Sequence, residues 1–146
     1  MSLIDRSALP RMTEAFMDLD HDEFIDLLDE LKALLERYAA GEPVAEAIDG
    51  QLDRLVDHSR RHFAAEEAAM REHHFLPYPV HKRDHDEALA RMETAAREWR
   101  RHRNLGELRM TMLVQLPGWF FQHVSAMDLV TARFLAQQRQ AACSDE

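Results

Sequence analysis

Histidine and carboxylate side chains recur in this sequence at intervals that place them together on helix faces. His62 precedes Glu66 by four residues. His81 precedes His85 by the same interval, and residues four apart share one face of an α-helix. Imidazole nitrogens and carboxylate oxygens are common protein ligands of iron, manganese and zinc ions. The spacing therefore points to metal binding.

A further pair is spaced differently. His123 and Asp128 are five residues apart in the stretch WFFQHVSAMD, which corresponds to a rotation of about 140° on a regular α-helix. Asp128 would then approach a shared site from the flank, as a group that bridges two ions does. A local π-bulge would instead bring the two side chains into line, and such bulges favour functional sites.

Four long segments carry apolar residues at alternating steps of three and four, which is the pattern of amphipathic helices. The residues that separate the segments are Pro10, Gly41, Pro43, Pro77, Pro79, Asn104 and Gly106. The four predicted faces run from Met17 to Tyr38, from Ile48 to Met70, from His81 through Ala95 to Trp99, and from Leu113 through Met127 and Val130 to Phe134. We predict an all-α protein, an up-down-up-down antiparallel four-helix bundle. Pro117 either kinks the fourth helix or starts its main segment after a short one.

Seven titratable side chains lie in or beside these apolar faces. They are His21, His62, Glu66, His81, His85, His123 and Asp128. Burying one unpaired polar group costs about 1–3 kcal/mol, and a folded protein is stable by only about 5–15 kcal/mol in total, so something must satisfy these groups jointly. In up-down-up-down order all seven lie at one level of the bundle. Five imidazoles and two carboxylates there form a metal site whose ligand count suits two ions rather than one.

This ordered set resembles the hemerythrin family over nearly the whole chain. The resemblance is carried by LDHDEF around His21, HFAAEEAAM around His62 and Glu66, YPVHKRDH around His81 and His85, and WFFQHVSAMD around His123 and Asp128. It implies two iron ions, joined by an oxo or hydroxo bridge, that bind O₂ reversibly for transport, storage or sensing. By this resemblance, His81, His85 and His123 would hold one iron. His21 and His62 would hold the other, which keeps an open position, and Glu66 and Asp128 would bridge the two.

Apolar residues near the expected ligands predict a dry O₂ pocket formed by Phe24, Trp119, Phe120 and Val124. The alternatives are a di-iron oxidoreductase, such as a peroxidase or ferroxidase, and an iron-binding sensor module. Di-iron bundles that activate O₂ commonly carry Glu-x-x-His pairs, and the sequence contains none. We therefore expect an O₂-binding protein rather than an enzyme.

The remaining histidines show no comparable pattern. Nine histidines in 146 residues produce some pairs by chance, and His58 with His62 is one of them. We interpret His58 as solvent-facing, the alternative being a residue that supports a ligand from outside the site, and we assign His73 and His74 to capping or loop positions at the end of the second helix. The specific feature is the conjunction of one ligand set per helix at one level.

The bulk properties agree with a single bundle domain over residues 1–146, with a short lead at 1–11 and a polar tail at 139–146. The net charge of −9 excludes a nucleic-acid partner, because phosphate-backbone binding needs a basic face. No signal peptide is recognisable, and no apolar run approaches the ~20 residues that span a bilayer. Together with the single cysteine, Cys143, these features indicate a cytoplasmic protein with no membrane association. The protein partner, if the chain has one, is not indicated.

Overall fold

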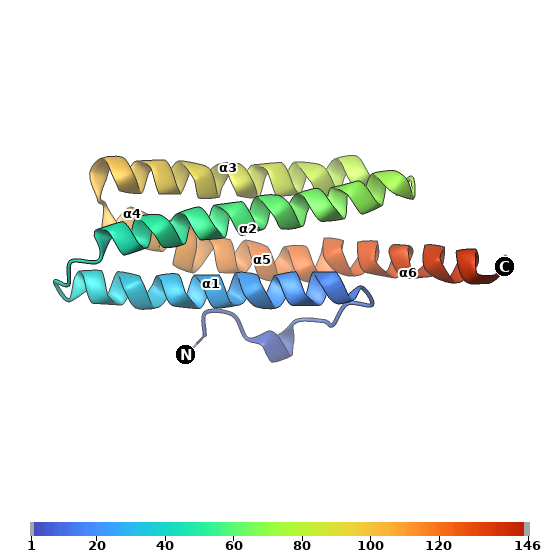
Figure 1. Ribbon diagram of the computed structural model, residues 1–146, viewed down its shortest axis with the longest axis horizontal. Helices are drawn as coiled ribbons and strands as arrows, with labels where there is room; N and C mark the ends of the chain where they lie inside the picture. Colours follow the sequence, from blue (N-terminus) through green and yellow to red (C-terminus); the bar gives the residue numbers. More distant parts are fainter. Residues whose placement is uncertain (1, 145–146) are drawn as a thin grey trace.

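Four antiparallel helical rods form the structure (Figure 1). The computed structural model describes residues 2–144. The first three rods are α1 (Ala15–Ala39), α2 (Ala45–Glu72) and α3 (Tyr78–His102), and the fourth consists of α4 (Leu105–Arg109), η2 (Met110–Gln115), α5 (Leu116–His123), η3 (Val124–Asp128) and α6 (Leu129–Ser144). The chain reverses direction at each connection, so the predicted all-α four-helix bundle is confirmed.

The two ends of the chain extend the bundle. The lead contains the short 3-10 helix η1 (Arg6–Ala8), and Ile4 is buried. Arg6 pairs with Asp22 and Asp26 of α1 and so ties the lead to that helix. At the other end α6 continues through most of the predicted tail, while residues 1, 145 and 146 lie outside the described part. A single domain over residues 1–146 remains a prediction.

Short connections keep consecutive rods adjacent. Gly41 has φ +93°, a backbone conformation in which a side chain would be strained. Arg103 ends α3 in the left-handed conformation, and its N–H bonds to the Trp99 carbonyl at 2.8 Å. Asn104 then caps the next helix, because its side-chain oxygen accepts from the Glu107 N–H at 3.1 Å. The fourth rod therefore starts directly where the third one ends.

The first two apolar faces are buried as predicted. Every predicted position from Met17 to Leu35 on α1 and from Ile48 to Met70 on α2 is buried, and only Tyr38 is half-buried. On α3 the small residue in the core is Ala96 rather than the predicted Ala95. The core thus has long apolar faces interrupted by the titratable side chains.

The fourth rod departs from the predicted pattern after His123, because η3 is π-helical and fits one extra residue into a turn. The predicted buried residues were Met127, Val130 and Phe134. The buried residues are instead Asp128, Thr131 and Leu135, each one position later, and Val130 is 52% exposed. The predicted face was therefore wrong beyond η3, and of the two arrangements for Asp128 the structure has the π-helical one.

Pro117 lies inside the fourth rod, as the second residue of α5. A proline ring crowds the carbonyl group four residues earlier, which here belongs to Leu113 in η2. We attribute the π-helical η2 to the relief of this contact. The extra residue in η2 places Met112 in the core, whereas the predicted Leu113 is only half-buried.

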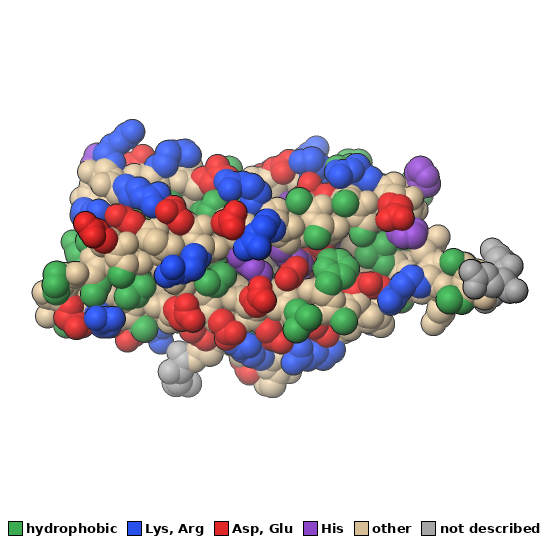
Figure 2. Space-filling model, in the orientation of Figure 1, with side chains coloured by type: hydrophobic (Ala, Val, Ile, Leu, Met, Phe, Trp, Pro, Cys, Tyr) green, Lys and Arg blue, Asp and Glu red, His purple; other side chains and the backbone are tan. Residues whose placement is uncertain are grey.

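The surface carries charged side chains of both signs, interspersed over the face drawn in Figure 2. None of the helices in the described residues combines the length and the apolar character needed to cross a bilayer.

Deletion of Ala126, an exposed residue of η3, tests the role of this segment. The shortened rod could continue as a regular α-helix, with Asp128 four residues after His123 and the same side chains in the core. We expect the variant to keep its stability within about 1 kcal/mol when unfolding in urea is followed by circular dichroism.

Deletion of Val130, which is also exposed, provides the control. This deletion forces either Asp128 or Thr131 and Leu135 away from the core, and we expect a loss of about 2 kcal/mol or more. Equal stability losses in the two variants would contradict the assignment of η3 as the site of the extra residue.

Candidate metal centre

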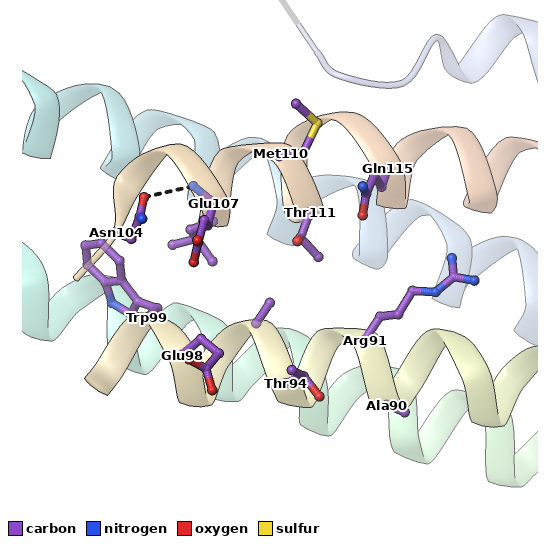
Figure 3. Close-up of a pocket in the computed structure, with 12 residues that line it drawn as sticks. Ala90, Arg91, Thr94, Glu98, Trp99, Asn104, Glu107, Met110, Thr111 and Gln115 are labelled. Atoms are coloured by element: carbon purple, nitrogen blue, oxygen red, sulfur yellow. Dashed lines mark hydrogen bonds between the residues drawn. The ribbon is translucent and has the colours of Figure 1, made fainter. Parts of the chain in front are cut away.

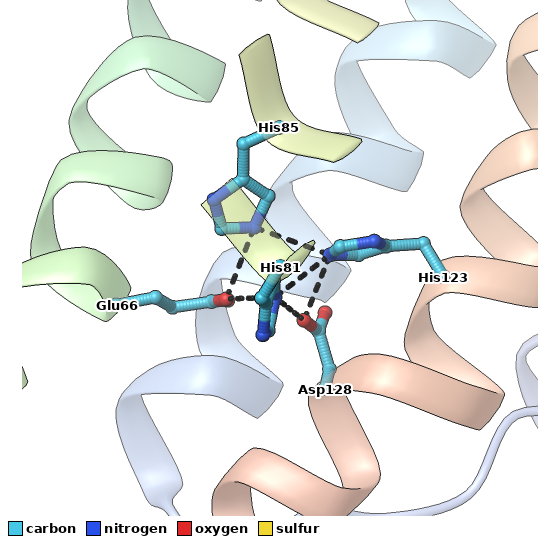
Figure 4. A group of neighbouring side chains, drawn as sticks. All are labelled: Glu66, His81, His85, His123 and Asp128. Atoms are coloured by element: carbon cyan, nitrogen blue, oxygen red, sulfur yellow. Dashed lines mark hydrogen bonds and ion pairs between the residues drawn. The ribbon is translucent and has the colours of Figure 1, made fainter. Parts of the chain in front are cut away.

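Seven titratable side chains converge in the core from all four rods. They are His21 of α1, His62 and Glu66 of α2, His81 and His85 of α3, His123 of α5 and Asp128 of η3, and none is more than 8% exposed. Figure 4 shows five of them pointing toward one another from α2, α3 and the fourth rod. The structure thus brings together every predicted ligand, while metal binding by these residues remains a prediction.

Five of the side chains form a first group. These are Glu66, His81, His85, His123 and Asp128, whose candidate ligand atoms all lie within 4.8 Å of one another. The Nε2 atom of His123 is 3.2 Å from Nε2 of His81 and 3.2 Å from Nε2 of His85. Two nitrogens bound at right angles to one metal ion at about 2.1 Å would be about 3.0 Å apart. The imidazoles are therefore spaced as neighbouring ligands of a single ion.

A second group shares both carboxylates with the first. Its members are His21, His62, Glu66 and Asp128, again with candidate ligand atoms within 4.8 Å. Asp128 directs Oδ1 toward the Nε2 atoms of His81 and His123, at 3.0 and 2.9 Å. Its other oxygen, Oδ2, is 2.8 Å from Nε2 of His21. Asp128 thus divides its two oxygens between the groups, as a carboxylate that bridges two ions does.

Glu66 shows the same division and provides a test of whether cations fit. Its Oε1 contacts Nε2 of His62, and its Oε2 is 3.4 Å from Nε2 of both His81 and His85. Glu66 is fully buried, yet neither oxygen makes a hydrogen bond of good geometry with the described residues. Leaving a carboxylate in this state is costly, and a cation on each side would remove the cost. The donor set therefore fits two metal ions.

Four of the five imidazoles are held from outside through Nδ1. The pairs are His62 with Asp20 at 2.7 Å, His81 with Thr131 at 2.9 Å, His85 with Glu67 at 2.9 Å and His123 with Asp84 at 2.6 Å. A carboxylate only accepts hydrogen bonds, so Nδ1 carries the N–H and Nε2 is the atom left for a metal. The sequence reasoning missed all four outer partners in this role.

The hydroxyl group of Thr131 contacts both His81 and a backbone carbonyl of η3. The Thr131 hydroxyl donates to the carbonyl of Met127 at 2.9 Å. Because its only hydrogen is used there, the same oxygen must accept from Nδ1–H of His81. The π-helical segment therefore supports a candidate ligand on the neighbouring helix.

The buried groups shift one another's protonation. Burial acts to raise the pKa of Asp128, but His123 and the other facing imidazoles outweigh it and hold that pKa well below its usual range. Burial acts to lower the pKa of His62, but the Glu66 and Asp20 carboxylates outweigh it and raise that pKa to about 10. The pKa values of His81 and His123 are raised in the same way, so without metal the protons on His62, His81 and His123 balance the ionised carboxylates. A metal ion that binds here displaces those protons into solution.

A small cavity adjoins the second group. Its lining includes His21, His62, Phe24, Phe63, Trp119 and Phe120, and its volume is about 10 Å³, close to the about 10–15 Å³ that one water molecule requires. Phe120 stacks on Phe24 with ring centroids 4.5 Å apart and lies edge-on to His21. Of the predicted pocket residues, Val124 is buried but does not line this cavity, and Phe63 lines it without having been predicted.

A wider groove lies between α3 and the segment formed by α4 and η2 (Figure 3). Its volume is about 490 Å³, and its lining includes Trp99, Leu108 and Met110. None of the seven clustered side chains lines it. The groove is therefore separate from the candidate metal centre.

The interpretation of His58 as solvent-facing was wrong. This residue is only 7% exposed, and its Nε2 lies 3.0 Å from the backbone oxygen of Asp20 on α1. The buried side of α2 is wide enough at this level to include His58 beside Ser59 and His62. The interval of four residues from His62 was the available indication.

A four-helix bundle with a buried cluster of histidines and carboxylates has the architecture of a cation-binding helical protein. Residues 12–135 match the hemerythrin HHE cation binding domain, and the chain belongs to this family. A bacteriohemerythrin of Aquifex aeolicus is 31% identical over 133 residues, which cover 91% of this chain and 98% of that protein. A bacteriohemerythrin of Ralstonia nicotianae is 31% identical over 140 residues, covering 94% and 93%. No solved structure matches the chain significantly.

Replacement of Asp84 tests the importance of the outer contacts. One oxygen of Asp84 accepts from Nδ1 of His123 and from Nε1 of Trp119, at 2.6 and 3.1 Å. In Asp84→Asn the orientation and basicity of His123 are no longer fixed, and we expect the affinity for ferrous iron to fall about 10–100-fold. Competition with a chelator under anaerobic conditions measures this affinity.

Asp86→Asn is the matched control, because Asp86 is exposed and pairs with Lys82. We expect its affinity to change less than about twofold. Asp84→Asn and Asp86→Asn proteins with the same affinity would show that Asp84 does not support the metal centre.

Proposed function

We propose that this chain is a non-heme di-iron protein that binds O₂ reversibly, as a carrier, a store or a sensor. The observation that carries the proposal is the small cavity beside the group with only two histidines. An ion in that group has fewer protein ligands than its neighbour, and a position kept open next to a cavity is the usual arrangement for binding a small ligand. The two bacteriohemerythrin relatives support the same chemistry.

The ligand assignment follows the two groups. We propose that one iron is held by His81, His85 and His123, the other by His21 and His62, and both by Glu66 and Asp128. Iron held by these residues would supply the electrons that O₂ binding requires. The protein contributes orientation, charge balance and a shielded space.

The side chains around the cavity favour retention of a bound ligand. Phe24 and Phe120 stack to form an apolar wall, and both are buried. Nε2 of His21 faces Asp128, and both nitrogens of His62 face carboxylates. The apolar wall limits the access of water to the cavity, and Nδ1–H of His62 is already engaged with Asp20.

The composition of the donor set favours binding over oxidation chemistry. Five imidazoles and two carboxylates carry less negative charge than the carboxylate-rich sets of di-iron bundles that activate O₂. Less negative charge gives less stabilisation to highly oxidised iron. We therefore propose a role without turnover, and the oxidoreductase alternative is an outcome of the following test.

Air exposure of the iron-loaded, reduced protein tests the proposed function. We expect two iron ions per chain by metal analysis, and a visible absorption band that appears with O₂ and disappears when O₂ is removed, over repeated cycles. Irreversible oxidation in the first cycle, with a co-substrate consumed, would identify an oxidoreductase instead. A chain that takes up no iron would refute both.

Phe120→Ala tests the shielding role of the cavity wall. Phe120 is 4% exposed, and removal of its ring opens the cavity beside His21 to water. We expect the oxygenated protein to oxidise irreversibly several-fold faster, as measured by the decay of the absorption band. Phe121→Ala, at a neighbouring residue that is 41% exposed, should decay at the wild-type rate. Equal decay rates in the two variants would remove Phe120 from the mechanism.

A further inference from the structure

His58 is a buried histidine outside the candidate metal centre, and both of its ring nitrogens face oxygen acceptors. Nε2 lies 3.0 Å from the backbone oxygen of Asp20, and Nδ1 lies 3.3 Å from Oε2 of Glu23. A backbone carbonyl and a carboxylate only accept hydrogen bonds, so an imidazole nitrogen beside such an oxygen is satisfied by an N–H or by a metal ion between them. His58 is therefore aimed, from a buried position, at a carboxylate of the neighbouring helix.

The two contacts differ in length. The hydrogen bond from Nε2–H to the Asp20 carbonyl has ordinary length, whereas Nδ1 and the Glu23 carboxylate are farther apart. A cation held between Nδ1 and Oε2 would satisfy both atoms.

His58 lies between a depression of the surface and the buried cluster. It lines a surface depression of about 290 Å³ together with Glu23, and it also lines the small cavity beside His21 and His62. Figure 2 shows histidine side chains at the surface between α1 and α2. The His58 side chain therefore separates the depression from the cavity.

The charged side chains that line the depression would not repel a cation. Its two arginines already have partners: Arg54 donates to the side chain of Gln51, and Arg61 pairs with Asp57 at 3.2 Å. The Glu23 side chain is 65% exposed and faces His58. An exposed ligand can adjust its position around an incoming ion.

We propose that Asp20, Glu23 and His58 form an additional, solvent-accessible site for a divalent transition-metal ion, which captures ferrous iron on its way to the buried centre. Candidate ligand atoms of the three residues lie within 4.8 Å of one another. One imidazole and two carboxylates suit Fe²⁺, Mn²⁺ and Zn²⁺. The capture role rests on the proposed function, whereas the site itself does not.

Asp20 provides the link to the centre. Its backbone oxygen accepts from His58, and Oδ2 of its carboxylate accepts from Nδ1 of His62. An ion bound at this carboxylate is one side chain away from a candidate ligand of the centre. Partial exposure and only three protein ligands make the site weaker than the buried one, as capture and release require.

Calorimetric titration of the iron-loaded, air-oxidised protein with Zn²⁺ tests the site. We expect one zinc ion per chain with the iron content unchanged, and at least about tenfold weaker zinc binding in Glu23→Gln. Glu23 is exposed, so this replacement leaves the core intact. Asp26→Asn removes the same charge from the same depression, and its partner Arg6 keeps Asp22, so this variant should bind zinc within about twofold of wild type.

The absence of zinc binding to the wild-type protein, or equal binding by Glu23→Gln and wild type, would overturn the site. Failure of the proposed function would appear separately, as an iron count well below two per chain before zinc is added.

Iron uptake tests the capture role. Metal-free protein is mixed with Fe²⁺ under anaerobic conditions, and the loss of free Fe²⁺ is followed with a chromogenic chelator. We expect Glu23→Gln to take up iron several-fold more slowly than wild type or Asp26→Asn, and to reach the same final iron content. Equal rates would show that the surface site, even if it binds zinc, does not supply the centre.

Discussion

Two ionised carboxylates in the middle of a helical core are the constraint on which the rest of the structure depends. Glu66 and Asp128 are almost completely buried, and an uncompensated charge at such a depth costs several kcal/mol. The imidazoles that surround them are aimed inward by three further carboxylates, those of Asp20, Glu67 and Asp84. These five carboxylates carry five negative charges, close to the four positive charges of two divalent ions. The same contacts therefore serve stability and the binding of cations.

The bundle meets this constraint by bringing one ligand set from each rod to a common level. Antiparallel neighbours align the start of one helix with the end of the previous one, so distant parts of the sequence meet without long loops. Regular helices suffice for His62 with Glu66 and for His81 with His85. The fourth rod needs an irregular turn, because its histidine and its carboxylate are five residues apart.

The sequence sufficed for the fold and for the seven clustered side chains, because both depend on periodicity within single helices and on the order of the helices. The face beyond His123 was missed, since the sequence alone left open whether η3 would absorb the extra residue. Thr131 and Asp84 were missed for another reason. Each acts on a histidine of a neighbouring rod, and the rotation of one helix against another is not encoded in the spacing along either. The prediction that His58 faces solvent was wrong because the buried side of α2 is wider than its central row of apolar residues.

The hydroxyl group of Thr131 makes the geometry of the last helix and the chemistry of His81 interdependent. It holds a backbone carbonyl of the irregular turn with its hydrogen and the imidazole of α3 with its lone pair. Tightening that turn would move the acceptor away from the ring, and a stronger pull on the ring would strain the turn. A change in helix geometry at the start of α6 would therefore alter the hydrogen bond to Nδ1 of His81. The last helix is in this way coupled to a candidate metal ligand on α3.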